Sequence, residues 1–237
     1  MQPITPTVLA GIQKNSFIDY PGKISCVLFI TGCNFTCPYC HNADLARGKY
    51  PARIESGDAL AFLRGRRGLL EGVTLTGGEP TLDRGIVDLC RAIKSMGYPV
   101  KLDTNGSRPD VLHRLMAMQL VDFIAMDIKA PLDHYHPFSD YPDIQKKLAD
   151  SVHLIMQHAS AYEFRTTCAA PFAQPAAIET IARTIEGAAC FVLQSFNRGA
   201  QCLDPGFNHR QDPTLSAAAM QRLRALAAPF VQRCIIR

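Results

Sequence analysis

Three cysteines within eight residues are the feature of this chain best suited to chemistry: Cys33, Cys37 and Cys40 form a CxxxCxxC run. Three closely spaced thiolates suit a [4Fe–4S] cluster in which the fourth iron has no protein ligand. An iron without a protein ligand is open to a substrate or cofactor, so such a cluster can do more than carry electrons. We therefore predict one [4Fe–4S] cluster held by these three cysteines.

A zinc site is the alternative interpretation of the same run. Structural zinc usually has four nitrogen or sulfur ligands, often supplied as two pairs, and no second pair is present in the sequence. His41 directly follows Cys40, which makes it awkward for both to bind one ion. The other six cysteines are scattered singly, so we expect neither a second cluster nor a disulfide framework.

Composition limits the classes of protein to consider. The chain has 237 residues, of which 47% are hydrophobic, enough for one domain with a substantial core. No apolar run approaches a membrane span, and residues 1–10 lack a signal-peptide pattern, so we expect a cytoplasmic protein without a membrane partner. The net charge is only +4 and tryptophan is absent, which predicts no nucleic-acid partner. The basic run Arg64-Gly65-Arg66-Arg67 is typical of a solvated helix end, with a landing site for an acidic electron carrier as the alternative.

Short apolar runs alternate with longer amphipathic segments along the chain. We expect strands at 24–30, 73–76, 100–103, 123–128, 162–168 and 190–194, and a short edge strand at 231–236. Helices are expected at 58–66, 84–96, 110–118, 144–158, 176–186 and 216–227, whereas 131–142 is irregular and a candidate mobile loop. This alternation predicts an α/β fold with parallel strands, and six units fall short of a closed eight-unit barrel. We expect an open, partial (β/α)6 barrel in a single domain over 1–237, with its core at about 20–200 and a C-terminal helix and tail at 205–237.

Polar residues gather at the expected carboxyl ends of these strands, where parallel α/β folds bind ligands. They are the cysteine run, Gly77-Gly78-Glu79-Pro80, Asp103-Thr104-Asn105, Asp127 with Lys129, and Arg165, while Gln194 and Asn197 follow the last strand. The paired glycines leave main-chain N–H and C=O groups open to a small zwitterion. Glu79 could attract the ammonium group of that ligand, and Lys129 or Arg165 its carboxylate. Asp103 and Asp127 could bond ribose hydroxyls or hold a cation together.

The CxxxCxxC run, followed about forty residues later by GGEP on the next expected strand, resembles the radical S-adenosylmethionine (SAM) superfamily. The resemblance extends from about residue 11 to residue 205, and the family fold is a partial (β/α)6 barrel. It implies that Cys33, Cys37 and Cys40 hold the cluster and that the amino and carboxylate groups of SAM bind its open iron. It also implies reductive cleavage of SAM to methionine and a 5′-deoxyadenosyl radical.

Further motifs are similar to those of glycyl-radical-enzyme activating enzymes. They are SFIDYPG at 16–22, His41-Asn42 after the last cysteine, DTNG at 103–106 and DIK at 127–129. The likeness is to the compact activators of anaerobic ribonucleoside-triphosphate reductase, which are related to those of pyruvate formate-lyase. It implies an oxidoreductase that takes a glycine Cα hydrogen from a large partner enzyme. It also implies flavodoxin or ferredoxin as electron donor, and an anaerobic role.

The same resemblance assigns roles to individual residues. Gly77, Gly78 and Glu79 would meet the SAM amino group, and Lys129 its carboxylate. Asp103 would lie on the ribose side and Tyr39 on the adenine side, with Arg165 also in the SAM site. Asp103, Thr104 and Asp127 would frame a monovalent cation, and Asp19 would face the glycine-bearing loop of the partner. A late histidine of some relatives has no clear counterpart, with Gln194 and Asn197 as the candidates.

Two other functions stay open at this point. One is a radical SAM enzyme acting on a small molecule, as in a 7-carboxy-7-deazaguanine synthase-like reaction. A shallow, open entrance to the active site would favour a peptide loop as substrate, and a closed pocket would favour a small molecule. The other is a non-catalytic iron–sulfur or zinc module, which would bind metal without cleaving SAM. The polar residues at the strand ends argue against the module.

Overall fold

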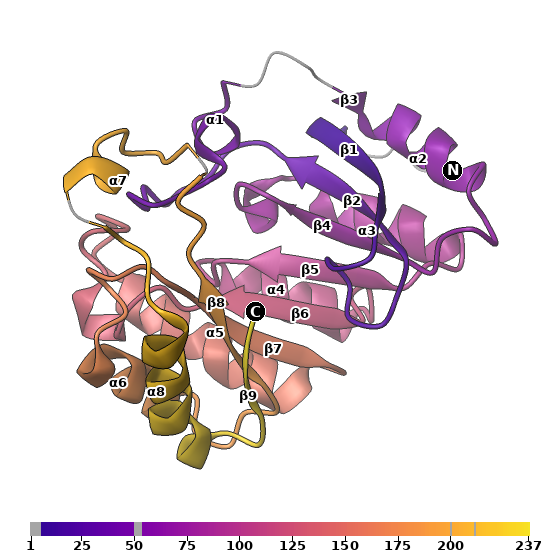
Figure 1. The fold of residues 1–237 in the computed structure, drawn as a ribbon. Helices are drawn as coiled ribbons and strands as arrows, with labels where there is room; N and C mark the ends of the chain where they lie inside the picture. The colour runs from indigo at the N-terminus through magenta and orange to yellow at the C-terminus, as the bar shows by residue number, and fades with distance from the viewer. Residues whose placement is uncertain (1–5, 50–53, 200, 211) are drawn as a thin grey trace.

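One sheet of nine strands organises the part of the chain that the structure describes (Figure 1). The computed structural model describes residues 6–49, 54–199, 201–210 and 212–237. The strand order is β3-β1-β2-β4-β5-β6-β7-β8-β9. The strands are β1 (Val8–Ser16), β2 (Ser25–Ile30), β3 (Ile54–Glu55), β4 (Gly72–Gly77), β5 (Val100–Thr104), β6 (Phe123–Asp127), β7 (Tyr162–Cys168), β8 (Phe191–Ser195) and β9 (Cys234–Ile236).

The sheet is mostly parallel and does not close. Strands β2 and β4 to β9 pair in parallel, each with its neighbour, whereas β1 pairs antiparallel with β2 and with β3. β3 and β9 form the two edges. The expected α/β fold with an open, partial parallel barrel is confirmed. The six expected strands correspond to β2 and β4 to β8, and the expected edge strand corresponds to β9.

All six expected helices are present, with ends shifted by at most two residues. The helices are α1 (Ala43–Ala46), α2 (Ser56–Arg64), α3 (Ile86–Ser95), α4 (Pro109–Ala117), α5 (Ile144–His158), α6 (Pro175–Thr184), α7 (Phe207–Arg210) and α8 (Ala217–Ala227), with 3₁₀ turns η1 (Pro80–Leu82), η2 (Leu132–His134) and η3 (Ala228–Phe230). None of the helices in the described ranges is long and apolar enough to span a membrane. The stretch 131–142 is packed at its centre, where Tyr135 and Phe138 are almost completely buried.

Four elements were not predicted from the sequence. β1 mixes buried, half-buried and exposed residues without strict alternation, and β3 has two residues, so neither gives a period-two signal. α1 and α7 have four residues each, about one helical turn, which is too short for a helical period. The single domain expected over 1–237 stays a prediction, and residues 1–5 of the stretch considered for a signal peptide lie outside the described ranges. β1, before the expected core, and β9, in the expected tail, both pair into the same sheet.

The parallel strands present an apolar side to the helices and a more polar side to the concave interior. Successive strand residues point to opposite faces. In β7, Phe164 and Cys168 belong to the hydrophobic core, while Glu163 and Arg165 alternate with them. Helices α3, α4 and α5 lie along one side of the sheet in Figure 1. Charged side chains therefore lie on the concave side of the sheet.

The loop between β1 and β2 folds back over the amino-terminal half of the concave side. Buried Tyr20 packs on Phe123 of β6, with ring centroids 6.1 Å apart. The main-chain oxygen of Asp19 accepts a hydrogen bond from Thr74 Oγ1 on β4 at 3.5 Å. Gly77 is three residues further along β4, a distance of about 10 Å. The loop that carries Asp19 therefore contacts the amino-terminal halves of β4 and β6, on the same concave side of the sheet as Gly77.

Candidate active site

A cavity of about 230 Å³ lies at the carboxyl ends of β2, β4, β5, β6 and β7. Eleven of the thirteen predicted site residues line it: Cys33, Cys37, Tyr39, Cys40, Gly77, Gly78, Asp103, Thr104, Asp127, Lys129 and Arg165. Glu79 and Asp19 do not line it, and neither do Gln194 and Asn197. The topology therefore brings together residues spread over more than 130 positions of the sequence, while their individual roles stay predictions.

The cysteine loop is held by main-chain hydrogen bonds on two sides. On one side, Cys33 N donates to Ala46 O of α1 at 3.0 Å. On the other, Leu203 N donates to Cys40 O at 2.9 Å, and Asp204 N donates to Pro38 O at 3.0 Å. Figure 1 shows this segment after β8, in orange, passing beside the purple loop near α1. The position of the loop is thus fixed by elements from both ends of the barrel.

The three cysteines do not form a site for a single metal ion. Within the described part of the chain, no three His, Cys, Asp or Glu side chains converge as one metal ion requires. A zinc ion would need its sulfur ligands about 2.3 Å from one point. A [4Fe–4S] cluster binds each cysteine at a different iron, so its thiolates stand further apart. Burial raises the pKa of Cys37 to about 12, so iron would have to displace a proton from that thiol.

The two glycines after β4 allow this strand to approach the cysteine loop. A Cβ on Gly77, whose φ is +124°, would lie 2.3 Å from the Ile30 oxygen, and a Cβ on Gly78 would lie 2.0 Å from the Gly32 oxygen. Gly78 N donates to Ile30 O, and Glu79 N donates to Gly32 O, both at 2.8 Å. The Gly78 N–H is therefore engaged within the protein, contrary to the expectation that it is open. A ligand ammonium would in any case meet carbonyl oxygens, since it needs acceptors.

Glu79 is fully buried and serves the protein's own loops. Its Oε1 accepts hydrogen bonds from Thr81 N at 3.0 Å, Thr81 Oγ1 at 2.5 Å and Thr104 Oγ1 at 2.8 Å, and its Oε2 accepts one from Asn105 N at 2.6 Å. Burial raises the pKa of Glu79, while these four hydrogen bonds act to lower it. The structure thus gives this carboxylate four partners in place of the expected ligand ammonium. Its role toward SAM stays a prediction.

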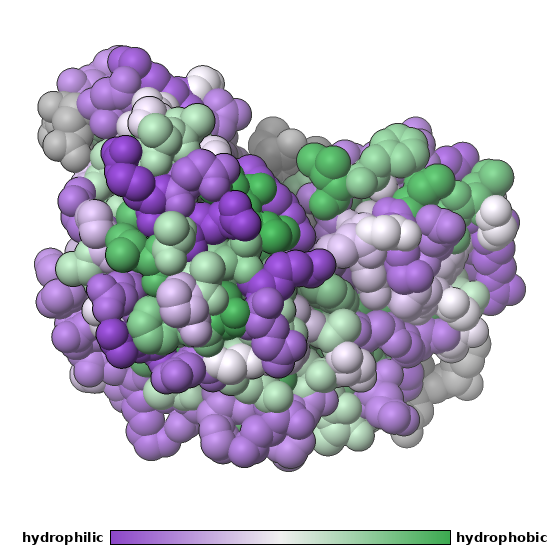
Figure 2. Space-filling view, turned by 60° about the horizontal axis from the view of Figure 1, so that its bottom comes forward, coloured by the Kyte–Doolittle hydropathy of each residue, from purple (hydrophilic) through white to green (hydrophobic). Residues whose placement is uncertain are grey.

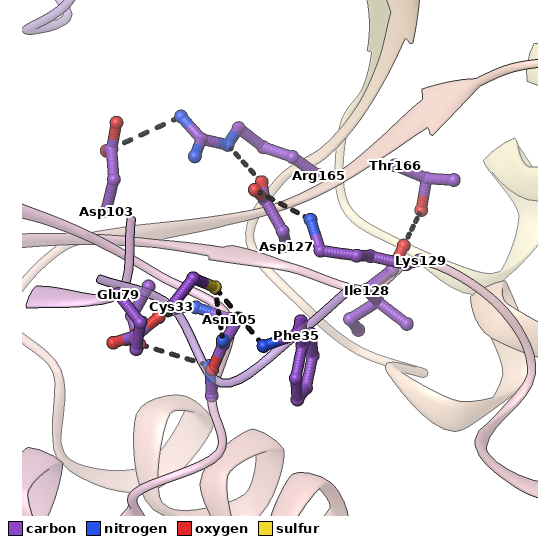
Figure 3. Close-up of polar contacts among 12 residues, drawn as sticks. Cys33, Phe35, Glu79, Asp103, Asn105, Asp127, Ile128, Lys129, Arg165 and Thr166 are labelled. Carbon is purple, nitrogen blue, oxygen red and sulfur yellow. Dashed lines mark hydrogen bonds and ion pairs between the residues drawn. The ribbon is translucent and has the colours of Figure 1, made fainter. Parts of the chain in front are cut away.

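Side chains of alternating charge form a row along the cavity wall from β5 to β7 (Figure 3). Asp103 pairs with Lys101 and lies 3.4 Å from Nη1 of Arg165, whose Nε donates to Asp127 Oδ1 at 2.8 Å. Lys129 Nζ lies 3.3 Å from the other oxygen of Asp127. The Arg165 guanidinium thus stands between the two carboxylates expected to frame a monovalent cation, and that cation stays a prediction.

The pKa values of Asp127 and Lys129 keep both of these groups charged. Burial alone would raise the pKa of Asp127, but Arg165 and Lys129 together lower it to about 2. Burial would likewise lower the pKa of Lys129, but Asp127 and Cys37 raise it well above its ordinary value. The Lys129 main-chain N–H also donates to Tyr135 Oη at 2.8 Å, which fixes the residue in the cavity wall. The cavity therefore presents permanent positive charge to an anionic ligand group.

An aromatic group closes the side of the cavity beside Tyr39. The Tyr39 ring contacts Phe138, Phe172 and Phe207, at centroid distances of 5.8, 5.5 and 6.0 Å. Its hydroxyl is buried and has no hydrogen-bond partner among the described residues. A buried hydroxyl without a partner is a group that a bound ligand can satisfy. Together with three thiols and the paired cations, this fits a cluster with an amino-acid-like ligand.

Sequence reasoning missed some residues at the site. Asn105 was expected at the polar end of its strand but was given no role, and it lines the cavity and contacts Cys33. Thr167 and Asn42 also line the cavity. Asn42 Nδ2 donates to Gly77 O at 3.3 Å and so links the cysteine loop to β4. The His41-Asn42 pair after the last cysteine was a signal that could have identified this link.

Comparisons with known proteins agree with this geometry. A sequence profile described as the radical SAM superfamily matches residues 27–165. A protein of Methanocaldococcus jannaschii, named a candidate glycyl-radical enzyme activating enzyme, is 30% identical over 97% of this chain and 95% of its own. The 7-carboxy-7-deazaguanine synthase of Geobacter sulfurreducens is 34% identical, but over 42% of this chain and 47% of its own. The structure of Streptococcus suis SuiB bound to the precursor peptide SuiA is similar in fold, with a TM-score of 0.63 at 14% identity, covering 88% of this chain and 48% of that chain.

Proposed function

This chain belongs to the radical SAM superfamily, and from that premise we propose that it activates a glycyl radical enzyme. Members of the superfamily use a [4Fe–4S] cluster and SAM. The observation that carries the proposal is the similarity to the M. jannaschii protein over nearly the full length of both chains. The likeness to 7-carboxy-7-deazaguanine synthase covers less than half of this chain, so the small-molecule alternative has weaker support.

In this proposal, Cys33, Cys37 and Cys40 hold the cluster, and the charged side of the cavity holds SAM. When bound, the reduced cluster would supply one electron to SAM, and together they would provide the radical chemistry that converts SAM and a glycine residue of the partner into methionine, 5′-deoxyadenosine and a glycyl radical. Lys129 and Arg165 orient the methionine carboxylate, and Asp103 accepts hydrogen bonds on the ribose side. Tyr39 bounds the adenine side. The electron comes from a flavodoxin or ferredoxin, and a monovalent cation completes the site.

Asp19 and its loop are proposed to meet the partner, which we take to be an anaerobic ribonucleoside-triphosphate reductase. Two exposed apolar residues precede Asp19: Phe17 and Ile18 are 76% and 85% exposed. The loop is nevertheless ordered, because Ser16 Oγ hydrogen-bonds the Asp19 carboxylate and Tyr20 is buried. On the face shown in Figure 2, hydrophobic residues form separate groups among polar ones. A rigid loop that exposes two large apolar side chains favours contact with another protein.

The test is anaerobic reconstitution followed by reduction in the presence of SAM. We expect 5′-deoxyadenosine and methionine in equal amounts from the wild-type protein and neither above background from Cys37→Ser. Iron and sulfide incorporation with intact SAM under strong reduction would refute the catalytic assignment. With the partner added, we expect a glycyl-radical EPR signal. Asp19→Ala should retain SAM cleavage and lose that signal, whereas unchanged partner activation would contradict the role of Asp19.

A further inference from the structure

Asn105 makes contacts that the proposed function leaves unexplained. It directly follows β5 and is 5% exposed. Its Nδ2 lies 3.8 Å from the sulfur of Cys33 and donates to Asn34 Oδ1 at 2.9 Å, as Figure 3 shows for the sulfur contact. Its Oδ1 accepts a hydrogen bond from Ser107 N at 2.9 Å. A buried amide therefore points its nitrogen at one of the cysteines proposed to hold the cluster.

The orientation of this amide is dictated by its neighbours. Ser107 N can only donate, so it selects the amide oxygen. Asn34 Oδ1 can only accept, and Asn34 is itself held because its Nδ2 donates to Ser107 Oγ at 2.9 Å. Rotating the Asn105 amide by half a turn would place a donor against a donor and an acceptor against two acceptors. The nitrogen therefore stays on the sulfur side.

The main chain of Asn105 is fixed as well. Asn105 N donates to Glu79 Oε2 at 2.6 Å, and Glu79 in turn accepts from Thr81 and Thr104. Through Glu79, the loop after β4 sets the position of the loop after β5, and hence of the amide relative to Cys33. Positioning Asn105 is thus a structural role for the buried Glu79 carboxylate, and this role requires no bound ligand.

The three cysteines differ in what their sulfurs accept. Cys33 Sγ accepts from Asn105 Nδ2 and also from Phe35 N at 3.4 Å. In the described ranges, the sulfurs of Cys37 and Cys40 accept no hydrogen bond from the protein. The donors therefore concentrate on one of the three ligands, and only one of those donors is a side chain that can be exchanged.

We propose that Asn105 is a positioning residue that sets the reduction potential of the cluster through its hydrogen bond to the Cys33 sulfur. The proposal rests on the proposed cluster site but needs neither SAM nor the partner. Reduction adds negative charge to the cluster and its thiolates, and a donor to a ligand sulfur stabilises that charge. Asn105 thus makes the cluster easier to reduce.

The experiment is an EPR-monitored redox titration of the reconstituted full-length protein without SAM, comparing Asn105→Ala with Asn34→Ala. Both changes remove an amide of the same network, but only Asn105→Ala removes the side-chain donor to sulfur. We expect Asn105→Ala to lower the equilibrium constant for cluster reduction by up to about tenfold, which is 59 mV more negative for a one-electron couple. Asn34→Ala should change it much less. Equal potentials for Asn105→Ala and wild type, or an equal shift in Asn34→Ala, would overturn the proposal.

A second measurement does not depend on the stability of Asn105→Ala. In protein labelled with [δ-15N]asparagine, pulsed EPR of the reduced cluster should detect a 15N coupling in the wild type and in Asn34→Ala. Asn105→Asp keeps the oxygen that accepts from Ser107 N and should lose the coupling. A wild-type protein without the coupling would overturn this inference alone, whereas a wild-type protein that assembles no cluster would overturn the proposed function with it.

Discussion

Glu79 and Asp127 are carboxylates at the same end of the sheet, yet their surroundings move their pKa values in opposite directions. Glu79 is surrounded by neutral donors from its own loop and the loop after β5, and burial raises its pKa. Asp127 is paired with Arg165 and Lys129, and its pKa is lowered to about 2. One carboxylate joins two loops, and the other organises cations.

The two sides of the cavity therefore have different roles. The side of β4 and β5 fixes the geometry around the cysteines with neutral hydrogen-bond donors. On the side of β5 to β7, Arg165 and Lys129 line the cavity together with Asp103 and Asp127, so these four charges balance. A ligand carboxylate would bind on this side through charge-assisted hydrogen bonds to the two cations.

The largest effect is expected from removing Glu79. Glu79→Ala would leave four buried donors without their acceptor, and each unsatisfied buried group costs about 1–3 kcal/mol. We expect the free energy of unfolding to fall by about 3–5 kcal/mol in urea denaturation, a range typical of severe core changes. Glu79→Gln keeps one acceptor oxygen and should lose less. A neutral result for Glu79→Ala would refute its structural role.

Removing Lys129 should affect ligand binding more than folding. Lys129→Met deletes a charge-assisted hydrogen bond worth about 1.5–3 kcal/mol, so the dissociation constant for SAM should rise at least tenfold in calorimetry. Lys101→Met is the matched control, because Lys101 is 2% exposed, pairs with Asp103 and does not line the cavity. We expect this control to lose stability and to keep most of its affinity. The opposite pattern would mean that the roles of the two lysines are exchanged.

The two carboxylates should give opposite pH dependences of stability. Asp127 has a lowered pKa, so its contribution is complete above its ordinary value of 3.8 and is lost as the pH falls toward about 2. Glu79 has a raised pKa, so the protein loses stability as the pH rises above the ordinary value of 4.5. Urea unfolding of wild type, Asp127→Asn and Glu79→Gln across pH would show both slopes. If both carboxylates changed the free energy of unfolding in the same direction with pH, the contrast drawn between them would be wrong.

The smallest effect is expected from Thr104→Val, which tests how much a single donor to Glu79 contributes. Thr104→Val removes one of its four donors, together with the hydroxyl oxygen that accepts from Gly106 N at 3.1 Å, and keeps the shape of the side chain. We expect a loss of about 1–3 kcal/mol in the free energy of unfolding in urea denaturation, because a buried N–H also loses its acceptor. A loss as large as that of Glu79→Ala would show that the donors act as one cooperative group.

Much of this architecture was predictable because it follows from local sequence. The apolar runs of β2 and β7 and the helical period of α5 are each contained within a short segment, so the longer strands and helices and the parallel fold class could be inferred. The cysteines and the charged residues were found because parallel strands bring their carboxyl ends together. Residue type and position relative to the strand ends were sufficient to identify these site residues.

The partners of Glu79 and Asn105 could not be predicted in the same way. Glu79 and Asn105 are 26 residues apart and meet only because the loops after β4 and β5 lie side by side. The sequence identifies Glu79 as an acid near a ligand, and nothing local shows that its acceptor capacity is taken up by Thr81, Thr104 and Asn105. The fold of the β1–β2 loop over the interior likewise depends on Tyr20 reaching Phe123, a contact between distant segments.

The open sheet carries a hazard that a closed barrel avoids, namely two edges with unpaired main-chain groups. Such edges can template the addition of strands from other copies and so begin aggregation. Here β9 has three residues, so the edge at β9 offers little length for pairing. Arg237 also reaches past β8 to hold Glu163 of β7 with two hydrogen bonds of 2.8 and 2.7 Å, which ties down the β9 edge. The sheet can therefore stay open at β9 without exposing a long template for strand addition.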